Sequence, residues 1–273
     1  MLFLSEKDLL KQIEESDSQN AVFYEDFKVR DSECDPFLRV HSRVLFSLMQ
    51  EASAHHVNSM PAYDVLDNTS LNWILNRMSI RLSHNPKVGD TVRIYTWQSN
   101  MNRLGFFRDY YLFDKEGRAF GAARSFWTIL DFDVHELINP MMLFTGALGP
   151  PMSKLRALPI QPIRLRRDFA DFTDKKSYET TVAYSNLDRN HHMNNTQYID
   201  LCRNAAALYE PGTNLASLDI NYVAELLLGE NIRVDVEKKE DETKAGENKF
   251  AIQAVNDADA VSFRALITLT DSF

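Results

Sequence analysis

The sequence predicts an α+β protein in which one antiparallel unit occurs twice. Each half begins with a strand, continues through a long helix and ends in strands with alternating apolar residues. A turn with the same pattern also recurs, because KVGDTVRI at 87–94 aligns with LLGENIRV at 227–234. Each half is roughly 130–140 residues long, a usual domain size, so the pattern indicates an internal duplication.

The first half starts with a short polar helix or a loose arm, through about residue 20, and a strand at 21–29. Apolar residues at three- and four-residue steps predict a helix over 37–60, which Pro61 ends. Alternation then predicts four strands, separated by turns rich in Gly, Asn and Asp, that begin near Met78, Val92, Phe107 and Ala123.

The second half repeats this order. A strand is predicted at 178–184 and a helix from about Asn195 to Tyr209. A solvated charged loop is expected from Glu237 to Asn248, among strands near 216–222, 232–236, 250–254 and 261–269. A strand, a central helix and an antiparallel meander around that helix are typical of the hotdog fold. The sequence therefore predicts a tandem hotdog, in which each antiparallel sheet wraps a long central helix.

A proline-rich and basic segment separates the two halves. Five prolines and two glycines interrupt residues 139–163, and arginines follow them. This composition is typical of a linker between domains. The predicted boundaries are 1–139 for the N-terminal unit, 140–167 for the linker and 168–273 for the C-terminal unit.

Composition excludes several classes of function. The net charge of −9 argues against broad binding of nucleic acid or acidic membranes. The two cysteines, Cys34 and Cys202, have no metal-like spacing and fit a reducing compartment. No run is long enough for a membrane span, and the short apolar start is followed at once by charges. We therefore expect a cytoplasmic protein.

The densest group of polar side chains lies between residues 184 and 198, just before the second predicted helix. Asp188, Asn190 and His192 fall at i, i+2 and i+4, a spacing that puts them on one side of an extended chain and crowds them in a tight turn. Asn194 or Asn195 can then cap the helix. Alone, such residues are more often turn and cap residues than catalytic ones.

The motif LDRNHHMNNTQY at 187–198 resembles the LD-x-N-x-H-x-NN-x-x-Y signature of the plant and bacterial acyl-[acyl carrier protein] thioesterases. Segments 73–78, 86–92 and 96–97 are similar to that family's N-terminal unit. The resemblance covers most of the chain, roughly residues 22–269.

The resemblance implies a tandem hotdog that hydrolyses acyl-carrier thioesters, releases free fatty acid and so terminates chain elongation. It implies no metal or cofactor. Its active site belongs to the second unit, at Asp188, Asn190 and His192, and the first unit lines the acyl pocket. Glu225 matches the family's acidic residue on the next strand, in a looser surrounding match.

The chemistry of these residue types is consistent with that role. Asp188 can act as a general base toward water or attack the thioester directly, and the sequence does not choose between them. Asn190 and His192 can position the acid, the water or the carbonyl. Backbone N–H groups at the start of the following helix suit an oxyanion. Arg164, Arg166 and Arg167 form a basic cluster that is expected to dock an acidic carrier protein.

Several alternatives stay open at this point. A cysteine nucleophile is disfavoured, since Cys202 falls on an apolar helix face and Cys34 among acidic residues. Glu51 is interpreted as structural, and the two His-His pairs lack a third ligand for a metal. An acyl-CoA thioesterase, a hotdog dehydratase and a silent acyl-binding protein remain rivals. Acyl chain length and the choice between monomer and homodimer are not predicted.

Overall fold

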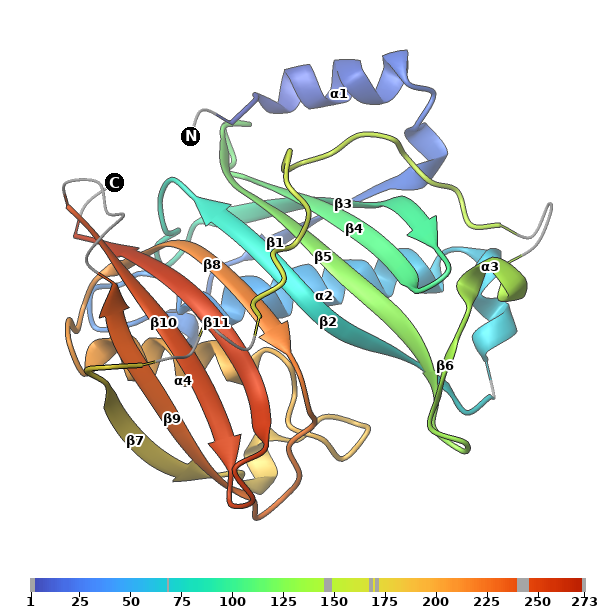
Figure 1. Cartoon of the computed structure of the whole chain (residues 1–273). Coiled ribbons are helices and arrows are strands. Elements are labelled where there is room, and N and C mark those ends of the chain that lie inside the picture. The colour runs from blue at the N-terminus through green and yellow to red at the C-terminus, as the bar shows by residue number, and fades with distance from the viewer. Residues whose placement is uncertain are drawn as a thin grey trace.

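One antiparallel sheet runs through both halves of the chain (Figure 1). The computed structural model describes residues 3–67, 69–144, 149–166, 169, 172–239 and 246–271. Within them eleven strands form the sheet, in the order β1-β3-β4-β5-β2-β8-β11-β10-β9-β7, with β6 paired to β5. Their bounds are β1 Val22–Lys28, β2 Leu71–Leu82, β3 Thr91–Asn102, β4 Gly105–Phe113, β5 Ala119–Asp131, β6 Glu136–Ile138, β7 Lys176–Thr181, β8 Asn214–Tyr222, β9 Asn231–Lys239, β10 Glu247–Asn256 and β11 Val261–Thr270. The predicted predominance of antiparallel strands is therefore confirmed.

The same order of strands occurs twice. The first half pairs β1-β3-β4-β5-β2, and the second half pairs β7-β9-β10-β11-β8 in the corresponding order. The two series join where β2 pairs with β8, from Arg77 opposite Asn221 to Arg81 opposite Ser217. A bond between the Arg81 guanidinium and the buried Asp219 carboxylate, at 3.0 Å, crosses this junction. The two halves therefore share one continuous sheet and are not separate domains joined only by a linker.

The two long helices, α2 (Ser42–Asn58) and α4 (Gln197–Ala207), lie on one face of this sheet and contact each other. α2 packs on β1 and β3, and α4 packs on β7, β9 and β10. The predicted first helix started too early, at residue 37. Residues 35–39 instead form a turn in which Leu38 has φ +62°, so helical geometry begins only at Ser42.

The opposite face of the first half is covered by the N-terminal helix and by the proline-rich segment. α1 (Glu6–Glu15) starts at a capping box between Ser5 and Asp8, and it buries Leu9 and Ile13 against β3 and β4. Burial of two such side chains stabilises the fold by about 1.5–3 kcal/mol each. The N-terminal segment is thus a docked helix and not a loose arm.

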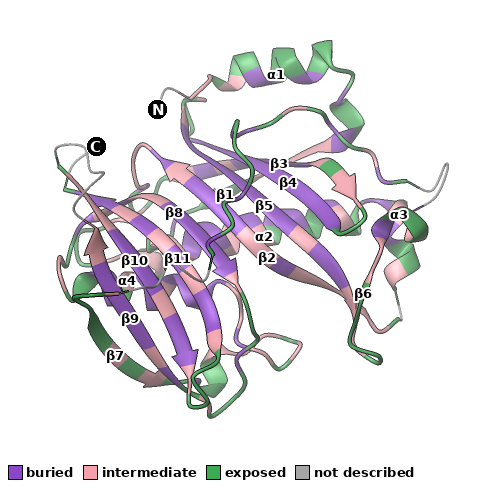
Figure 2. Ribbon diagram, in the orientation of Figure 1, coloured by how far each residue is buried: buried purple, intermediate pink, exposed green. Residues whose placement is uncertain are grey.

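The proline-rich segment begins with α3 (Pro140–Leu143) and then crosses the sheet in extended form. The Trp97 indole N–H donates to the Leu155 carbonyl at 2.8 Å, and the Ala157 N–H donates to Asp109 Oδ1 at 2.8 Å. Further along, the Leu165 N–H donates to Asn221 Oδ1 at 2.9 Å. The described part of the proline-rich segment is therefore hydrogen-bonded to both halves. Figure 2 shows buried residues concentrated on the strands between these covering layers and the long helices.

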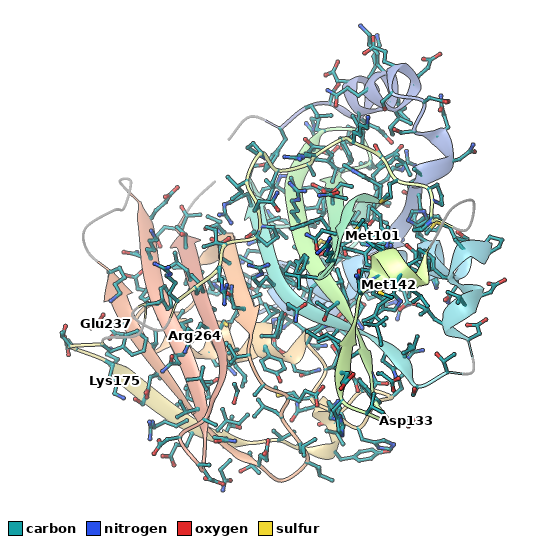
Figure 3. The ribbon with its side chains drawn as sticks, turned by 45° about the vertical axis from the view of Figure 1, so that its right-hand side comes forward. Met101, Asp133, Met142, Lys175, Glu237 and Arg264 are labelled. Carbon is teal, nitrogen blue, oxygen red and sulfur yellow. The ribbon has the colours of Figure 1, made fainter. Side chains whose placement is uncertain are left out.

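The charged loop predicted from Glu237 begins three residues too early. β9 continues through Lys239, and the Glu237 carboxylate is 6% exposed because it accepts the backbone N–H groups of Thr173 and Asp174. Figure 3 shows Glu237 and Lys175 at the same edge of the sheet. Residues 240–245 of that loop lie outside the described residues.

Candidate active site

The loop that carries Asp188 is closed by its own backbone. The Asp188 N–H donates to the His192 carbonyl at 2.8 Å, and Leu187 bridges to Met193. Asp188 Oδ1 accepts the N–H groups of Asn190 at 2.8 Å and His192 at 3.4 Å. His191 completes the turn at φ +62°, a conformation uncommon for a residue other than glycine. Oδ1 therefore holds the loop, and Oδ2 remains for chemistry.

A cavity of about 490 Å³ lies between this loop, α2 and strands β2 to β5. That volume is in the range of small-molecule sites. Half-buried Asp188 and Asn190 are at its mouth, while its base holds the fully buried Gln98, Phe106 and Arg108. The remaining lining residues are Gln50, Glu51, Ser53, Ala54, Val57, Asn58, Trp73, Trp127, Arg189, Asn194 and Asn195. The polar loop of the second half thus opens onto a pocket built mostly from the first.

One wall of this pocket, at Trp73 and Phe106, belongs to an apolar cluster that extends to α3. Phe144 packs edge to face with Tyr63 and Phe106, and Trp73 packs edge to face with the same two rings. Figure 3 shows Met142 on α3 and Met101 of β3 near it. Such a wall suits an apolar chain that enters past Asp188.

His192 and Glu225 form a pair beside the cavity, not within its lining. His192 Nε2 is 3.3 Å from Glu225 Oε2, and the imidazole lies 6.0 Å from the ring centre of Phe132. The Glu225 side chain is 47% exposed, so the pair itself contributes little to stability. Of the four predicted site residues, the structure brings Asp188 and Asn190 to the cavity and joins His192 to Glu225 next to them.

The first half contains a loop of the same geometry at 35–39, where the sequence has DPFLR in place of an Asp-x-Asn-x-His motif. The Asp35 N–H donates to the Arg39 carbonyl at 2.7 Å, and Asp35 Oδ1 accepts the N–H groups of Phe37 and Arg39 at 2.8 and 3.0 Å. Leu38 takes the position of His191 at φ +62°. Here, however, the Arg39 guanidinium binds Asp35 Oδ2 at 2.7 Å. In the sequence, the correspondence between the two loops is indicated by the aspartate that begins each of them. The residues after that aspartate differ between the two halves.

Glu51 occupies a more suggestive place than its structural interpretation implied. It lines the mouth of the cavity from α2, across from the Asp188 loop. Its Oε1 is 3.1 Å from His55 Nε2, and His55 Nδ1 is 2.7 Å from Glu25 Oε2. The hydrogen bond that the His55 ring donates to the Glu25 carboxylate raises the pKa of His55. The structural assignment of Glu51 stays a prediction.

The basic cluster is only partly described. Arg164 and Arg166 are exposed at the end of the crossing segment, and Arg167 lies outside the described residues. Burial and then the nearby Arg164 charge lower the pKa of Arg77, so positive charges gather here. This surface is therefore locally basic in an acidic protein.

The cysteines are poorly suited to nucleophilic attack. Cys202 is fully buried in α4, and burial raises the pKa of its thiol. Burial and the neighbouring carboxylates, Asp31 first, also raise the pKa of Cys34. Both directions agree with the sequence-based expectation. The described part of the chain contains no group of three His, Cys, Asp or Glu side chains that could hold a metal, and none of its helices could cross a membrane.

Two family models match this chain. That of the acyl-ACP thioesterase N-terminal domain matches residues 20–139, and that of the C-terminal domain matches residues 170–268. A palmitoyl-acyl carrier protein thioesterase of Arabidopsis thaliana, described as chloroplastic, is 25% identical over 65% of this chain and 45% of its own length. A dodecanoyl-[acyl-carrier-protein] hydrolase of Umbellularia californica is 24% identical over 65% of this chain and 49% of its own. The chain spans about half the length of the curated relatives it matches.

Solved structures share this fold at low sequence identity. An acyl-ACP thioesterase from Bacteroides thetaiotaomicron has a TM-score of 0.76 at 20% identity, over 92% of this chain and 99% of that one. The 12:0-ACP thioesterase from Umbellularia californica has a TM-score of 0.75 at 20% identity, over 91% and 93%. A MaoC-like dehydratase also matches, with a TM-score of 0.61 at 10% identity over 93% and 99%. The fold by itself therefore does not select the reaction.

Proposed function

The chain belongs to the acyl-ACP thioesterase family, and we propose that it hydrolyses acyl-[acyl carrier protein] thioesters, releases free fatty acid and so terminates chain elongation. The observation that carries the proposal is the position of Asp188 and Asn190 at the mouth of a cavity of about 490 Å³ that has one apolar wall. An acyl chain in that cavity would bring its thioester carbonyl to the two polar side chains.

The proposed architecture is the tandem hotdog, with units at 1–139 and 168–273 and a linker at 140–167. The repeated strand order and the two matching aspartate loops support a duplicated unit. The linker would then be a strap across the sheet. In the first loop the Arg39 guanidinium binds Asp35 Oδ2, whereas Asp188 Oδ2 has no such partner among the described residues. We therefore expect one active site per chain, at Asp188.

In the proposed mechanism Asp188 removes a proton from water, or attacks the carbonyl carbon itself. In the first route, the water oxygen bonds to the carbonyl carbon and a tetrahedral oxyanion forms. Collapse of this intermediate breaks the carbon–sulfur bond, and the pantetheine sulfur leaves with a proton from Asp188. Asn190 would stabilise the oxyanion, a contribution of about 10²–10³ in rate for a single donor. At the start of α4, the N–H groups of Thr196, Gln197 and Ile199 already donate to Asn194 or Thr196.

His192 and Glu225 have a positioning role in this proposal. The His192 backbone donates to and accepts from Asp188, at 3.4 and 2.8 Å. Glu225 restrains the imidazole at 3.3 Å, so the pair would steady the loop that carries the acid. Because neither side chain lines the cavity, we assign the chemical step to Asp188.

The proposed partner is the acidic acyl carrier protein, docked on the surface of Arg164, Arg166 and Arg167. Arg164 and Arg166 are exposed and free to meet another protein. A local positive field in a chain of net charge −9 would steer such a partner and set its orientation.

Hydrolysis of purified acyl-carrier thioesters, followed with a thiol indicator, tests the proposal. We expect thiol release by the wild-type chain and a higher kcat/KM for the carrier thioester than for the CoA thioester of the same acyl chain. The reverse preference would favour the acyl-CoA thioesterase. Hydration of an enoyl thioester without thiol release would favour the dehydratase, and binding without either reaction would favour a silent binder.

A further inference from the structure

A positive charge lies at the base of the acyl cavity. Arg108, on β4, is 3% exposed and lines the same cavity as Asp188. Its Nη1 donates to Thr96 Oγ1 at 3.1 Å and to His56 Nδ1 at 3.2 Å. Its Nη2 is buried with no hydrogen-bond partner among the described residues. A guanidinium with free donors is an unusual base for a pocket that holds only hydrocarbon.

The neighbours of Arg108 do not neutralise it. Burial and the Arg108 charge lower the pKa of His56 to about 3, so His56 is neutral and accepts a hydrogen bond. Tyr63 donates to Gln98 Oε1, which satisfies that phenol without a charge. The described part of the chain gives Arg108 no carboxylate partner. Arg108 is therefore a buried, unpaired positive charge beside the cavity.

Glu51, Asp188 and Arg189 also line the cavity, but at its mouth, where they are exposed or half-buried. Water screens charges there more effectively than at the base. A plain methyl-ended chain that reached the base would lie beside this unpaired charge without compensating it, which costs binding energy.

From this geometry we propose that Arg108 binds an oxygen substituent of the acyl chain, a hydroxyl or a carboxylate far from the thioester, and so sets the substrate class. The inference rests on the proposed thioester hydrolysis. A carboxylate would accept a hydrogen bond from the guanidinium and would also form an ion pair with it. A hydroxyl would accept the hydrogen bond alone. Trp73, Val57 and Phe106 would hold the methylenes between the two ends.

The test compares N-acetylcysteamine thioesters of octanoic, decanoic and dodecanoic acids with their ω-hydroxy and ω-carboxy counterparts. For the wild-type chain we expect the best oxygenated substrate to exceed the plain one of equal length in kcat/KM. Arg108→Met should lower that ratio about tenfold to a hundredfold, the range for a hydrogen bond to a charged group. The difference between the two oxygenated series separates charge recognition from hydrogen bonding.

Arg203→Met is the matched control. Arg203 also has an unpartnered Nη1 and binds the Thr213 carbonyl, but it lines a different cleft. Its substitution should leave the substrate ratio unchanged. If Arg108→Met fails to fold, Arg108→Lys and the wild-type substrate ratio still test whether Arg108 recognises the oxygen substituent.

Binding of the free acids, measured by calorimetry, separates this inference from the proposed function. Tighter binding of the oxygenated acids that depends on Arg108 would support the inference even in a chain that hydrolyses no thioester. A wild-type preference for the plain chains, or a ratio that Arg108→Met does not change, would overturn it.

Discussion

Replacement of Asp188 by Asn separates the chemical role of this side chain from its structural one. Asn keeps an Oδ1 that can accept the N–H groups of Asn190 and His192, so the loop should persist. The free energy of unfolding should therefore change by less than about 1 kcal/mol. The amide is neither a base nor a nucleophile, and we expect kcat to fall by about 10²–10⁴, the usual contribution of a general base.

Asp188→Ala removes the same chemistry and also both hydrogen bonds. At about 0.5–1.5 kcal/mol for each bond, the Ala variant should lose about 1–3 kcal/mol of stability. Its kcat should be as low as that of the Asn variant. Single-turnover hydrolysis of an acyl-carrier thioester measures the loss of rate, and urea unfolding measures the loss of stability.

Asp35→Asn is the matched control, since Asp35 makes the same turn in the first half and differs in its Arg39 partner. That substitution should lower stability, through the weakened ion pair, with little change in kcat. The reasoning would be refuted by an Asp188→Asn enzyme within threefold of wild type, or by an equal loss of rate from Asp35→Asn.

Four further outcomes are expected. Glu225→Gln should lower kcat by about twofold to fivefold, as much as an exposed pair of 0.2–1 kcal/mol allows, and should add nothing to His192→Ala in a double-mutant cycle. A Cys34→Ser, Cys202→Ala variant should keep its activity in the thiol-release assay because the pKa of each thiol is raised, and a dead variant would restore the cysteine mechanism. The raised pKa of His55 means that its protonation stabilises the fold fully below about pH 6.5, and that this stabilisation is lost as pH rises through the folded pKa. Glu25→Gln should move the pKa of His55, measured by NMR titration, back toward its ordinary value. An unchanged titration curve would contradict the assignment to Glu25. Charge reversal at Arg164 and Arg166 should raise KM for the carrier thioester at low salt and leave an N-acetylcysteamine thioester unaffected, so equal effects on both would exclude a docking role.

Much of the fold could be predicted because it depends on local pattern. Strands such as β9 and β11 cover one buried face, and their apolar residues alternate. The family resemblance of the 187–198 motif is confirmed by the matching family models. The roles of Asp188, Asn190, His192 and Glu225, and the cytoplasmic location, stay predictions.

The features that could not be predicted depend on tertiary contacts. β4 is buried along its whole length, because α1 and the crossing segment cover the face that alternation would leave to water. Arg108 and Asp109 were therefore hidden inside an apparently ordinary strand. The β2–β8 junction was equally invisible, since no local rule specifies which strands of two units will pair.

The β2–β8 junction also has a consequence for how the site survives at low protein concentration. The cavity takes its walls from the first half and its aspartate loop from the second, so separated halves would have to find each other to make one site. In a single chain that encounter is intramolecular, with an effective concentration on the order of millimolar for a short connection. The proline-rich segment is hydrogen-bonded to both halves between Ser153 and Leu165, and this further restricts how far the halves can separate. Specific activity should therefore be independent of dilution, and neither β2 nor β8 presents a bare edge on which other chains could aggregate.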